Sequence, residues 1–174
     1  TATDGGLKFK TGSPVGLNLH ELNCTTLAKV RRYIVRVYYV ASCNICAPVA
    51  DGVPTLSVVE LQSVGGVLSM SDPRQVAPGV EDMHVEYGID ANADGSPDTY
   101  EVSTDTATPL YAWQNVMAVK VYLLVRDLNP TRDYVNAKDY VLGQQAIAAK
   151  NDDYKRAVFS ETVRLVNPSG AREP

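Results

Sequence analysis

The sequence predicts an α+β fold built mainly from an antiparallel β-sheet. Segments rich in Val, Ile, Tyr and Thr recur along the chain, and these residues suit a pleated, half-buried surface. Turns rich in Pro and Gly separate the segments, whereas only short and weak helical patterns are present. We expect the helical part of the fold to come mostly from an upstream helix.

The length and charge of the chain limit the number of domains and the kinds of partner that can be expected. The chain has 174 residues and a hydrophobic content of 45%, which suffices for one domain over residues 1–174 with a real core. Its formal net charge is −4, and basic and acidic residues are mixed along the sequence. Nucleic acid is therefore not expected as a partner, because phosphate binding needs clustered Lys and Arg.

No segment of the sequence approaches the roughly 20 apolar residues that span a bilayer. The apolar segment 116–125 is interrupted by Lys120, so the chain as given is expected to be soluble. Residues 1–6 (TATDGG) contain neither an initiator Met nor a signal-peptide pattern. We expect that a segment upstream has been removed.

The first half of the chain contains three predicted strands. Residues 1–28 are expected to be loops with one short element at 17–22. Residues 30–40 (VRRYIVRVYYV) and 55–62 (TLSVVELQ) are dense in β-formers and are joined by a loop with Pro48, Gly52 and Pro54. After turns at residues 71–73 and 78–79, residues 80–89 (VEDMHVEYGI) alternate apolar and polar, with an opening helical turn left possible.

The second half adds two strands and a long connection between them. Residues 113–125 (WQNVMAVKVYLLV) favour a central strand over a buried helix because of their Val and Tyr content. Residues 156–166 (RAVFSETVRLV) form the last alternating strand, and residues 167–174 a polar tail. The polar connection 127–153 is long enough that we expect it to be functional or ordered by its own side chains.

The three cysteines, Cys24, Cys43 and Cys46, are interpreted first as a source of one structural disulfide. In an oxidising compartment three pairings are open, and each leaves one thiol over. Unpaired buried thiols are the second interpretation. The Cys-Asn-Ile-Cys spacing also resembles redox and zinc motifs; a zinc site would need two further ligands, and Cys24, His20 and His84 are the candidates.

Residues 90–101 (DANADGSPDTYE) match the twelve-residue calcium loop D-x-[DN]-x-[DN]-G-x5-E at every specified position. Calcium prefers six to eight oxygen ligands, and Gly95 would supply the sharp turn that curls the loop around it. The sequence therefore predicts a Ca²⁺ site. Its expected ligands are the side chains of Asp90, Asn92, Asp94, Asp98 and Glu101, and the backbone carbonyl of Ser96.

The flanks of this loop differ from those of an EF-hand. Residues 84–89 and 100–103 are predicted as strands, not helices, so a calcium-sensor opening motion is not expected. Among the expected ligands, Glu101 depends most on the flanking structure, because the loop can close differently without a following helix. The competing interpretation is a polar turn rich in Asp and Gly between two strands.

Several segments together resemble the PilW family of type IV pilus assembly proteins. The resemblance runs from about residue 30 to the end of the chain, and residues before 30 do not match clearly. It is most specific at residues 79–100 (GVEDMHVEYGIDANADGSPDTY) and in the last strand. The matching segments are 30–41, 54–61, 79–100, 113–126 and 156–167.

The resemblance implies a pilin-like globular head that lacks its long N-terminal helix. Such a helix anchors the protein in the inner membrane and later packs in the filament core. The head would be periplasmic before assembly and extracellular in the pilus, where a disulfide is compatible with the compartment. Its partners would be other minor pilins, with which it primes assembly or forms the tip, and so serves adhesion and twitching motility.

Two related functions remain open beside this one. A type II secretion pseudopilin would share the pilin plan, and a calcium-dependent pilus-tip adhesin would use exposed aromatics such as Tyr134 and Tyr140. An enzyme is not expected, because no catalytic motif is present. His84 falls on the polar side of a predicted strand and is expected at the surface or an edge, not as a catalytic base.

Overall fold

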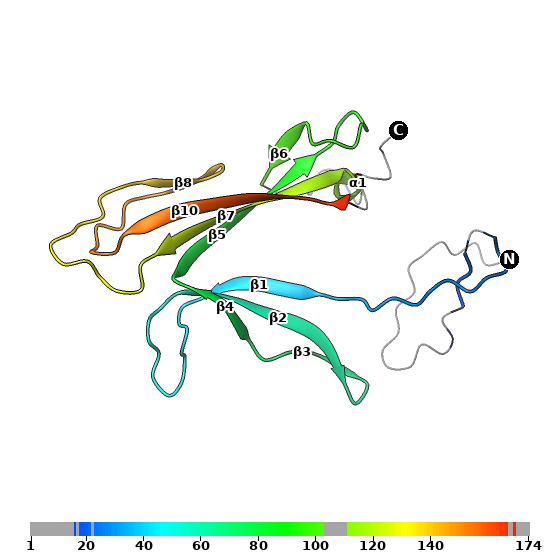
Figure 1. The fold of residues 1–174 in the computed structure, drawn as a ribbon, viewed down its shortest axis with the longest axis horizontal. Coiled ribbons are helices and arrows are strands. Elements are labelled where there is room, and N and C mark those ends of the chain that lie inside the picture. Colours follow the sequence, from blue (N-terminus) through cyan, green and yellow to red (C-terminus); the bar gives the residue numbers. More distant parts are fainter. Residues whose placement is uncertain (1–15, 17, 22, 103–110, 167–168, 170–174) are drawn as a thin grey trace. The chain divides into compact units, whose positions relative to one another are not determined.

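The computed structural model describes residues 16, 18–21, 23–102, 111–166 and 169. It is mainly antiparallel β-sheet, as predicted (Figure 1). Helical residues in the described part are few: α1 has four residues, and Val166 and Ser169 are also helical. The elements are β1 (Arg36–Ala41), β2 (Thr55–Val64), β3 (Val67–Met70), β4 (Arg74–Pro78), β5 (Val80–Ile89), β6 (Thr99–Glu101), α1 (Tyr111–Gln114), β7 (Val116–Arg126), β8 (Tyr140–Leu142), β9 (Gln145–Ile147) and β10 (Arg156–Arg164).

The strands form two four-stranded sheets and one small hairpin. The first sheet has the order β1-β2-β3, and β4 also pairs with β2. The second has the order β10-β7-β5-β6, and β8 pairs with β9 in the hairpin. Contacts divide the chain into two compact units, Thr1–Tyr38 with Ser57–Arg74 and Tyr39–Leu56 with Gln75–Pro174. One domain over residues 1–174 stays a prediction.

The register of the second sheet assigns its side chains to two faces. Met83 of β5 pairs with Leu123 of β7, which pairs with Phe159 of β10. Because side chains alternate along a strand, their neighbours in the ladder, such as Leu124, lie on the opposite face. The two faces of the sheet therefore present different side chains, and they differ in what packs against them.

The β8–β9 hairpin covers the face that contains Leu124. Leu124, Leu142 and Ile147 are buried together with Tyr140, and Tyr122 packs against them. This hydrophobic cluster belongs to the larger unit, and it forms over strand positions that the sequence marks as polar, including His84 and Glu86.

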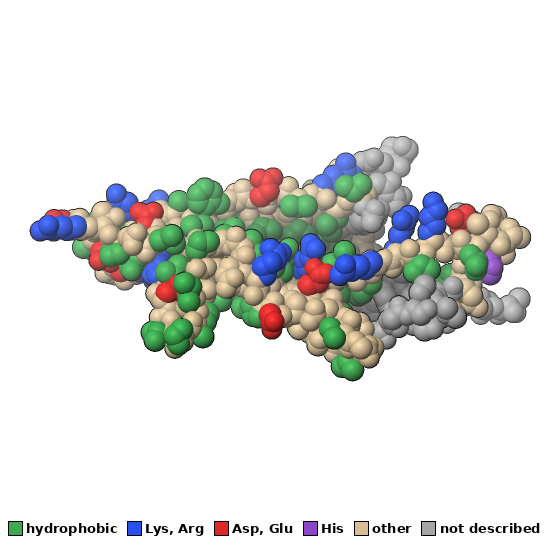
Figure 2. Space-filling view, turned by 60° about the horizontal axis from the view of Figure 1, so that its bottom comes forward, with side chains coloured by type: hydrophobic (Ala, Val, Ile, Leu, Met, Phe, Trp, Pro, Cys, Tyr) green, Lys and Arg blue, Asp and Glu red, His purple; other side chains and the backbone are tan. Residues whose placement is uncertain are grey.

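The opposite face, here called the apolar sheet face, is only partly covered. Its members are Met83, Val85, Tyr87, Val119, Val121, Leu123, Phe159 and Val163. Phe159 is 58% exposed and Val163 is 51% exposed, while the β5 and β7 residues are half-buried. Trp113, 57% exposed, meets the Tyr87 ring edge-on at 5.1 Å between ring centres. Figure 2 shows hydrophobic side chains at the molecular surface among charged ones.

The long connection between β7 and β10 is ordered by polar contacts. Asn136 is 1% exposed, and its Nδ2 donates to the Tyr140 hydroxyl at 3.0 Å and to the Tyr154 carbonyl at 2.9 Å. Its backbone N donates to the Asp152 carbonyl at 2.6 Å. The expectation that its own side chains order this segment is confirmed, and the hairpin β8–β9 lies within it.

Most predicted strands are present with shifted ends. The strand at 80–89 is β5 without any helical opening, whereas β1 begins at Arg36 instead of residue 30. Residues 113–114 belong to α1, not to the predicted strand, which begins at Val116. Residues 17 and 22 of the short element expected at 17–22, and most of the tail, lie outside the described residues. No helix in the described ranges is long and apolar enough to cross a membrane.

Candidate functional site

The candidate calcium loop connects β5 to β6. Ile89 and Thr99 form the last pair of the ladder, and the Asp98 backbone N donates to the Ile89 carbonyl at 2.8 Å. Residues 90–98 therefore form a hairpin loop between strands, as the flanking pattern predicts. The flank residue Ser103 lies outside the described part.

Asp90 organises the loop from inside. Its side chain is buried, with 1% exposure, and its Oδ1 accepts from the Ala93 backbone N at 2.6 Å. Its Oδ2 accepts from the Gly95 backbone N at 2.9 Å. Ala93 and Gly95 both have positive φ, 66° and 86°, so the chain curls tightly around this carboxylate.

Three more predicted ligands converge at the exposed side of the loop. Asn92 Nδ2 lies 3.2 Å from Asp94 Oδ2 and 3.3 Å from Asp98 Oδ1. The other oxygens of these side chains accept backbone N–H groups: Asp98 Oδ2 from Ala91, and Asp94 Oδ1 from Ser96. Each carboxylate thus keeps one oxygen directed at a shared position, where an amide donor now lies between two negative charges.

The last two predicted ligands are placed differently. Ser96 is exposed and its backbone N is held by Asp94. Glu101 lies in β6, where it pairs with Tyr87, and it is exposed. The structure therefore brings Asp90, Asn92, Asp94, Ser96 and Asp98 into one loop, whereas Glu101 follows after the hairpin has closed.

In the part of the chain that the structure describes, no three His, Cys, Asp or Glu side chains are arranged closely enough to hold a metal. Carboxylates that share a position repel each other unless a cation or a hydrogen-bond donor lies between them. The Asn92 amide bridges Asp94 and Asp98 instead. Binding a cation here would require the side chains to close in, and the loop supplies the oxygen chemistry that calcium prefers.

The structure joins Cys43 and Cys46 by a disulfide, with 5.3 Å between their Cα atoms. Cys24 is exposed and lies outside this bridge. Asp51 fastens the same loop, because its two carboxylate oxygens accept from the backbone N of Asn44 and of Ile45 at 3.0 Å each. Hydrogen bonds from backbone N–H groups, that of Val53 first, lower the pKa of Asp51.

The surface position expected for His84 is wrong. Its side chain is only 14% exposed, and its Nε2 lies 3.5 Å from Glu86 Oε1. Glu86, which the sequence did not single out, is 4% exposed and accepts from the Gln144 backbone N at 2.7 Å and the Tyr122 hydroxyl at 3.1 Å. Both residues lie beneath the hairpin turn, and alternation alone gives no sign of that cover.

Comparison with known families identifies the class of protein that carries this sheet and loop. The model of the type IV pilus-assembly protein W family, PilW, matches residues 37–167. The match spans well over half of the chain, so the chain belongs to this family, and the predicted resemblance is confirmed.

Family membership assigns the chain a role in type IV pilus assembly. It places the protein at the cell envelope or in the pilus, with partners in the pilus-assembly machinery, in a family that is generally non-enzymatic. Searches of curated proteins and of solved structures found no match.

Proposed function

We propose that the chain is the head of a minor pilin, which interacts with other minor pilins to prime pilus assembly or to form the tip. The family match over residues 37–167 carries this proposal. In this proposal the head packs against the N-terminal helix of its own pilin and needs an apolar surface for that contact. The apolar sheet face is such a surface, because contiguous exposed apolar groups mark interaction sites.

The partner of the apolar sheet face is, in this proposal, the N-terminal helix of the pilin. A helix with an apolar stripe would cover the half-buried β5 and β7 residues, and Phe159 and Val163 at the β10 margin would pack beside it. Glu161 lies on the same face, opposite Val121, and would face a polar position of the helix. The helical part of the α+β fold would come from this segment.

The test is assembly in the source cells. Phe159→Lys places a charge on the apolar sheet face, and we expect loss of surface pili and of co-purifying minor pilins. Leu128→Lys is the matched control, because Leu128 is 51% exposed but lies in the connection after β7. Normal piliation with Phe159→Lys, at normal protein level, would refute the role of this face.

We further propose that the loop at residues 90–98 binds Ca²⁺ and stabilises the head. The support is the convergence of Asp94 Oδ2 and Asp98 Oδ1 on one position, on a loop already curled by Asp90. A bound cation would replace the Asn92 amide donor between the two carboxylates. Glu101 would join only if β6 shifted, so the exposed oxygens of Ser96 and water would complete the coordination.

Calcium that binds only the folded protein raises its stability by mass action. We expect a saturable rise in the melting temperature between chelator and millimolar Ca²⁺, which is lost in Asp94→Asn and Asp98→Asn. Asp133→Asn is the control, since Asp133 is 88% exposed and forms an ion pair with its neighbour Arg132. An equal rise in all variants, or no rise in wild type, would remove the calcium site.

A further inference from the structure

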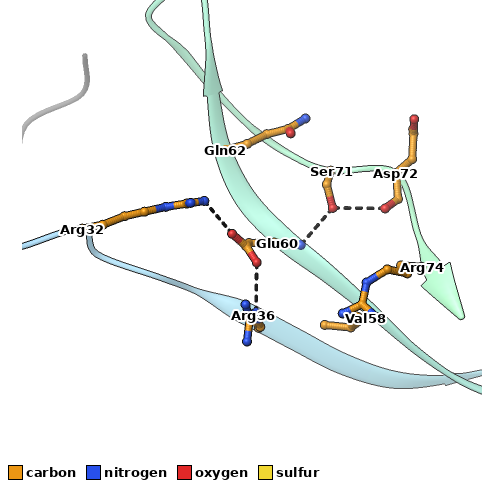
Figure 3. Close-up of a pocket in the computed structure, with 8 residues that line it drawn as sticks. All are labelled: Arg32, Arg36, Val58, Glu60, Gln62, Ser71, Asp72 and Arg74. Carbon is orange, nitrogen blue, oxygen red and sulfur yellow. Dashed lines mark hydrogen bonds and ion pairs between the residues drawn. The ribbon is translucent and has the colours of Figure 1, made fainter. Parts of the chain in front are cut away.

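A pocket lined by arginines lies in the smaller unit, away from the calcium loop in sequence (Figure 3). Its volume is about 470 Å³, within the range of sites that hold small ligand groups. Three segments supply its walls: residues 32–36, which lead into β1, the middle of β2, and residues 71–74, which lead from β3 into β4. The lining residues are Arg32, Arg36, Val58, Glu60, Gln62, Ser71, Asp72 and Arg74.

Glu60 holds two of the three arginines. Its Oε1 accepts from Arg32 Nη2 at 2.7 Å, and its Oε2 accepts from Arg36 Nε at 2.9 Å. The hydrogen bond and charge of Arg36 lower the pKa of Glu60, so this carboxylate stays ionised. With one arginine on each oxygen, Glu60 aligns both guanidinium groups and neutralises only one of their two charges.

Arg74 is the third arginine; its side chain makes no hydrogen bond or ion pair with the described residues, although its charge helps to lower the pKa of Glu60. Figure 3 shows its guanidinium extending over Val58 toward Arg36. Ser71 lines the same pocket, and its hydroxyl accepts from the Glu60 backbone N and donates to the Asp72 carbonyl, both at 3.0 Å. Gln62 adds an amide to the same wall.

The charge balance favours an anion. The lining contains three basic and two acidic side chains, in a chain whose net charge is −4. A planar guanidinium donates two parallel hydrogen bonds to a carboxylate, a geometry that lysine cannot reproduce. The aligned Arg36 and the unengaged Arg74 can therefore clamp one carboxylate between them.

We infer that this pocket binds a carboxylate carried by an acidic segment of a partner protein. Nucleic acid fits less well, because backbone binding requires an extended basic surface. Figure 2 shows basic side chains interspersed with acidic ones on the face drawn there. The inference rests on the pocket alone and holds whether or not the loop at 90–98 takes calcium.

The test titrates the full chain with a Glu-containing peptide, acetylated and amidated at its ends, and with its Gln counterpart. We expect NMR shifts at the side-chain N–H groups of Arg74, Arg36 and Gln62 with the Glu peptide only. Inorganic phosphate is titrated in parallel. Phosphate binding without peptide binding, or equal binding of both peptides, would overturn the carboxylate assignment.

Three variants make the result specific. Arg74→Gln should weaken binding of the Glu peptide about tenfold, since charge-assisted hydrogen bonds are lost. Arg132→Gln, at an arginine 95% exposed in the other unit, should leave binding unchanged. Glu60→Gln should strengthen binding, because it removes a competing negative charge while the Gln amide oxygen can still accept a hydrogen bond from an arginine. Weaker binding in a folded Glu60→Gln protein would overturn the clamp.

Discussion

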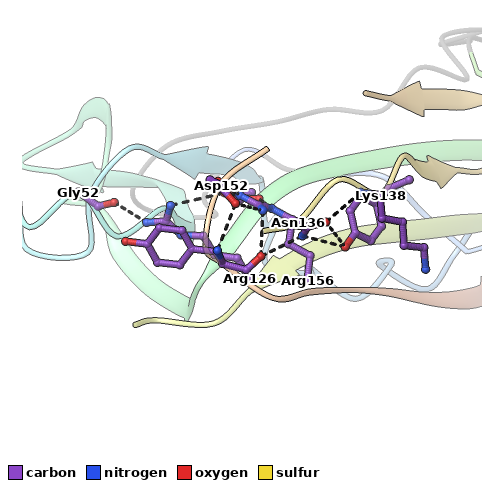
Figure 4. Close-up of polar contacts among 9 residues, drawn as sticks. Gly52, Arg126, Asn136, Lys138, Asp152 and Arg156 are labelled. Atoms are coloured by element: carbon purple, nitrogen blue, oxygen red, sulfur yellow. Dashed lines mark hydrogen bonds and ion pairs between the residues drawn. The ribbon is translucent and has the colours of Figure 1, made fainter. Parts of the chain in front are cut away.

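Arg156 and Asp152 form a two-bond ion pair between β10 and the end of the long connection (Figure 4). Arg156 Nη1 donates to Asp152 Oδ1 and Nη2 to Oδ2, both at 2.6 Å. The same guanidinium also binds Glu81 of β5, with Nε donating at 2.5 Å and Nη2 at 3.0 Å. One buried arginine, 1% exposed, therefore fastens the connection across the sheet.

Arg156→Met should be among the most destabilising changes in the larger unit. It leaves Glu81 and Asp152 without their main partner in a mostly buried position. Breaking such a pair by removing one member costs about 3 kcal/mol. We expect a loss of that order in the free energy of unfolding by urea, whereas Arg132→Met should change it by less than about 0.5 kcal/mol. A change in Arg156→Met as small as in the control would contradict this assignment.

The same ion pair predicts an acid-sensitive step. Hydrogen bonding by Arg156 lowers the pKa of Asp152 from 3.8 to about 2. The folded protein thus binds this proton more weakly than the unfolded chain, and the stabilisation is complete above about pH 4 and lost as the pH falls through 2.

The measurement for this step compares urea unfolding of wild type and Asp152→Asn at a series of acidic pH values. The stability difference between the two proteins should shrink as the pH falls from about 4 to about 2. Taking the difference removes contributions of other carboxylates with lowered pKa, such as Asp51 and Glu60. A difference that does not change over this range would count against the pair as the origin of the shift.

Gly143 at the hairpin turn should not tolerate a side chain. Its φ is 60°, and a Cβ there would overlap Glu86 Oε1 and lie 2.8 Å from Tyr122 Cε2. Gly65 is a matched control, since its φ is 59° and a Cβ would meet nothing within 4 Å. We expect Gly65→Ala to cost about 1 kcal/mol for the backbone conformation alone, and Gly143→Ala about 3 kcal/mol in thermal or urea unfolding. Equal losses of stability in the two variants would mean that the turn at Gly143 is not in tight contact with Glu86.

The strands of the second sheet can be predicted from the sequence because each one is marked by residues within its own segment. Alternation from Met83 to Tyr87 defines β5, and dense Val and Tyr residues define β7 and β10. Each strand can be recognised without knowing its neighbours. The ends are less predictable, since residues 30–34 resemble β1 in composition but lie outside the strand.

Which segment packs over a face of the sheet depends on contacts between distant parts of the chain, so it could not be predicted from the strand patterns. His84 and Glu86 occupy polar positions of β5, which by alternation alone should face water. The hairpin β8–β9 buries them instead, and its turn donates the Gln144 N–H to Glu86. Likewise, the residues of the arginine-lined pocket come from distant parts of the sequence, and no spacing rule connects Arg36 with Arg74. In the loop, by contrast, one motif predicts the clustering of Asp90, Asn92, Asp94 and Asp98, because all lie within nine residues.

The cysteine pairing of the structure can be checked directly. Peptide mapping without reduction should recover Cys43 and Cys46 as a linked pair, with Cys24 outside it. The bridge closes a very short loop, so replacing both cysteines by Ser should lower stability by only about 1.5 kcal/mol. A fragment in which Cys24 is linked to either residue would contradict the structure.

Variants of Asp90 and Asp94 should distinguish two roles within the loop, the folding of its backbone and the binding of a cation. Asp90 is buried and accepts two backbone N–H groups, from Ala93 and Gly95, and an Asn amide can accept through only one oxygen. We expect Asp90→Asn to lower stability by about 2 kcal/mol even in chelator, because a buried N–H loses its partner. Asp94 is exposed, and its bond from the Ser96 N–H survives in Asp94→Asn, so that change should cost less than about 0.5 kcal/mol in chelator.

Urea unfolding with and without calcium distinguishes the two residues. Asp90→Asn should be destabilised in both conditions, whereas Asp94→Asn should differ from wild type only when calcium is present. If both variants match wild type in chelator, Asp90 does not organise the loop. If Asp94→Asn loses as much stability in chelator as Asp90→Asn, the exposed carboxylates also hold the turn together, and their convergence then reflects backbone folding instead of readiness for a cation.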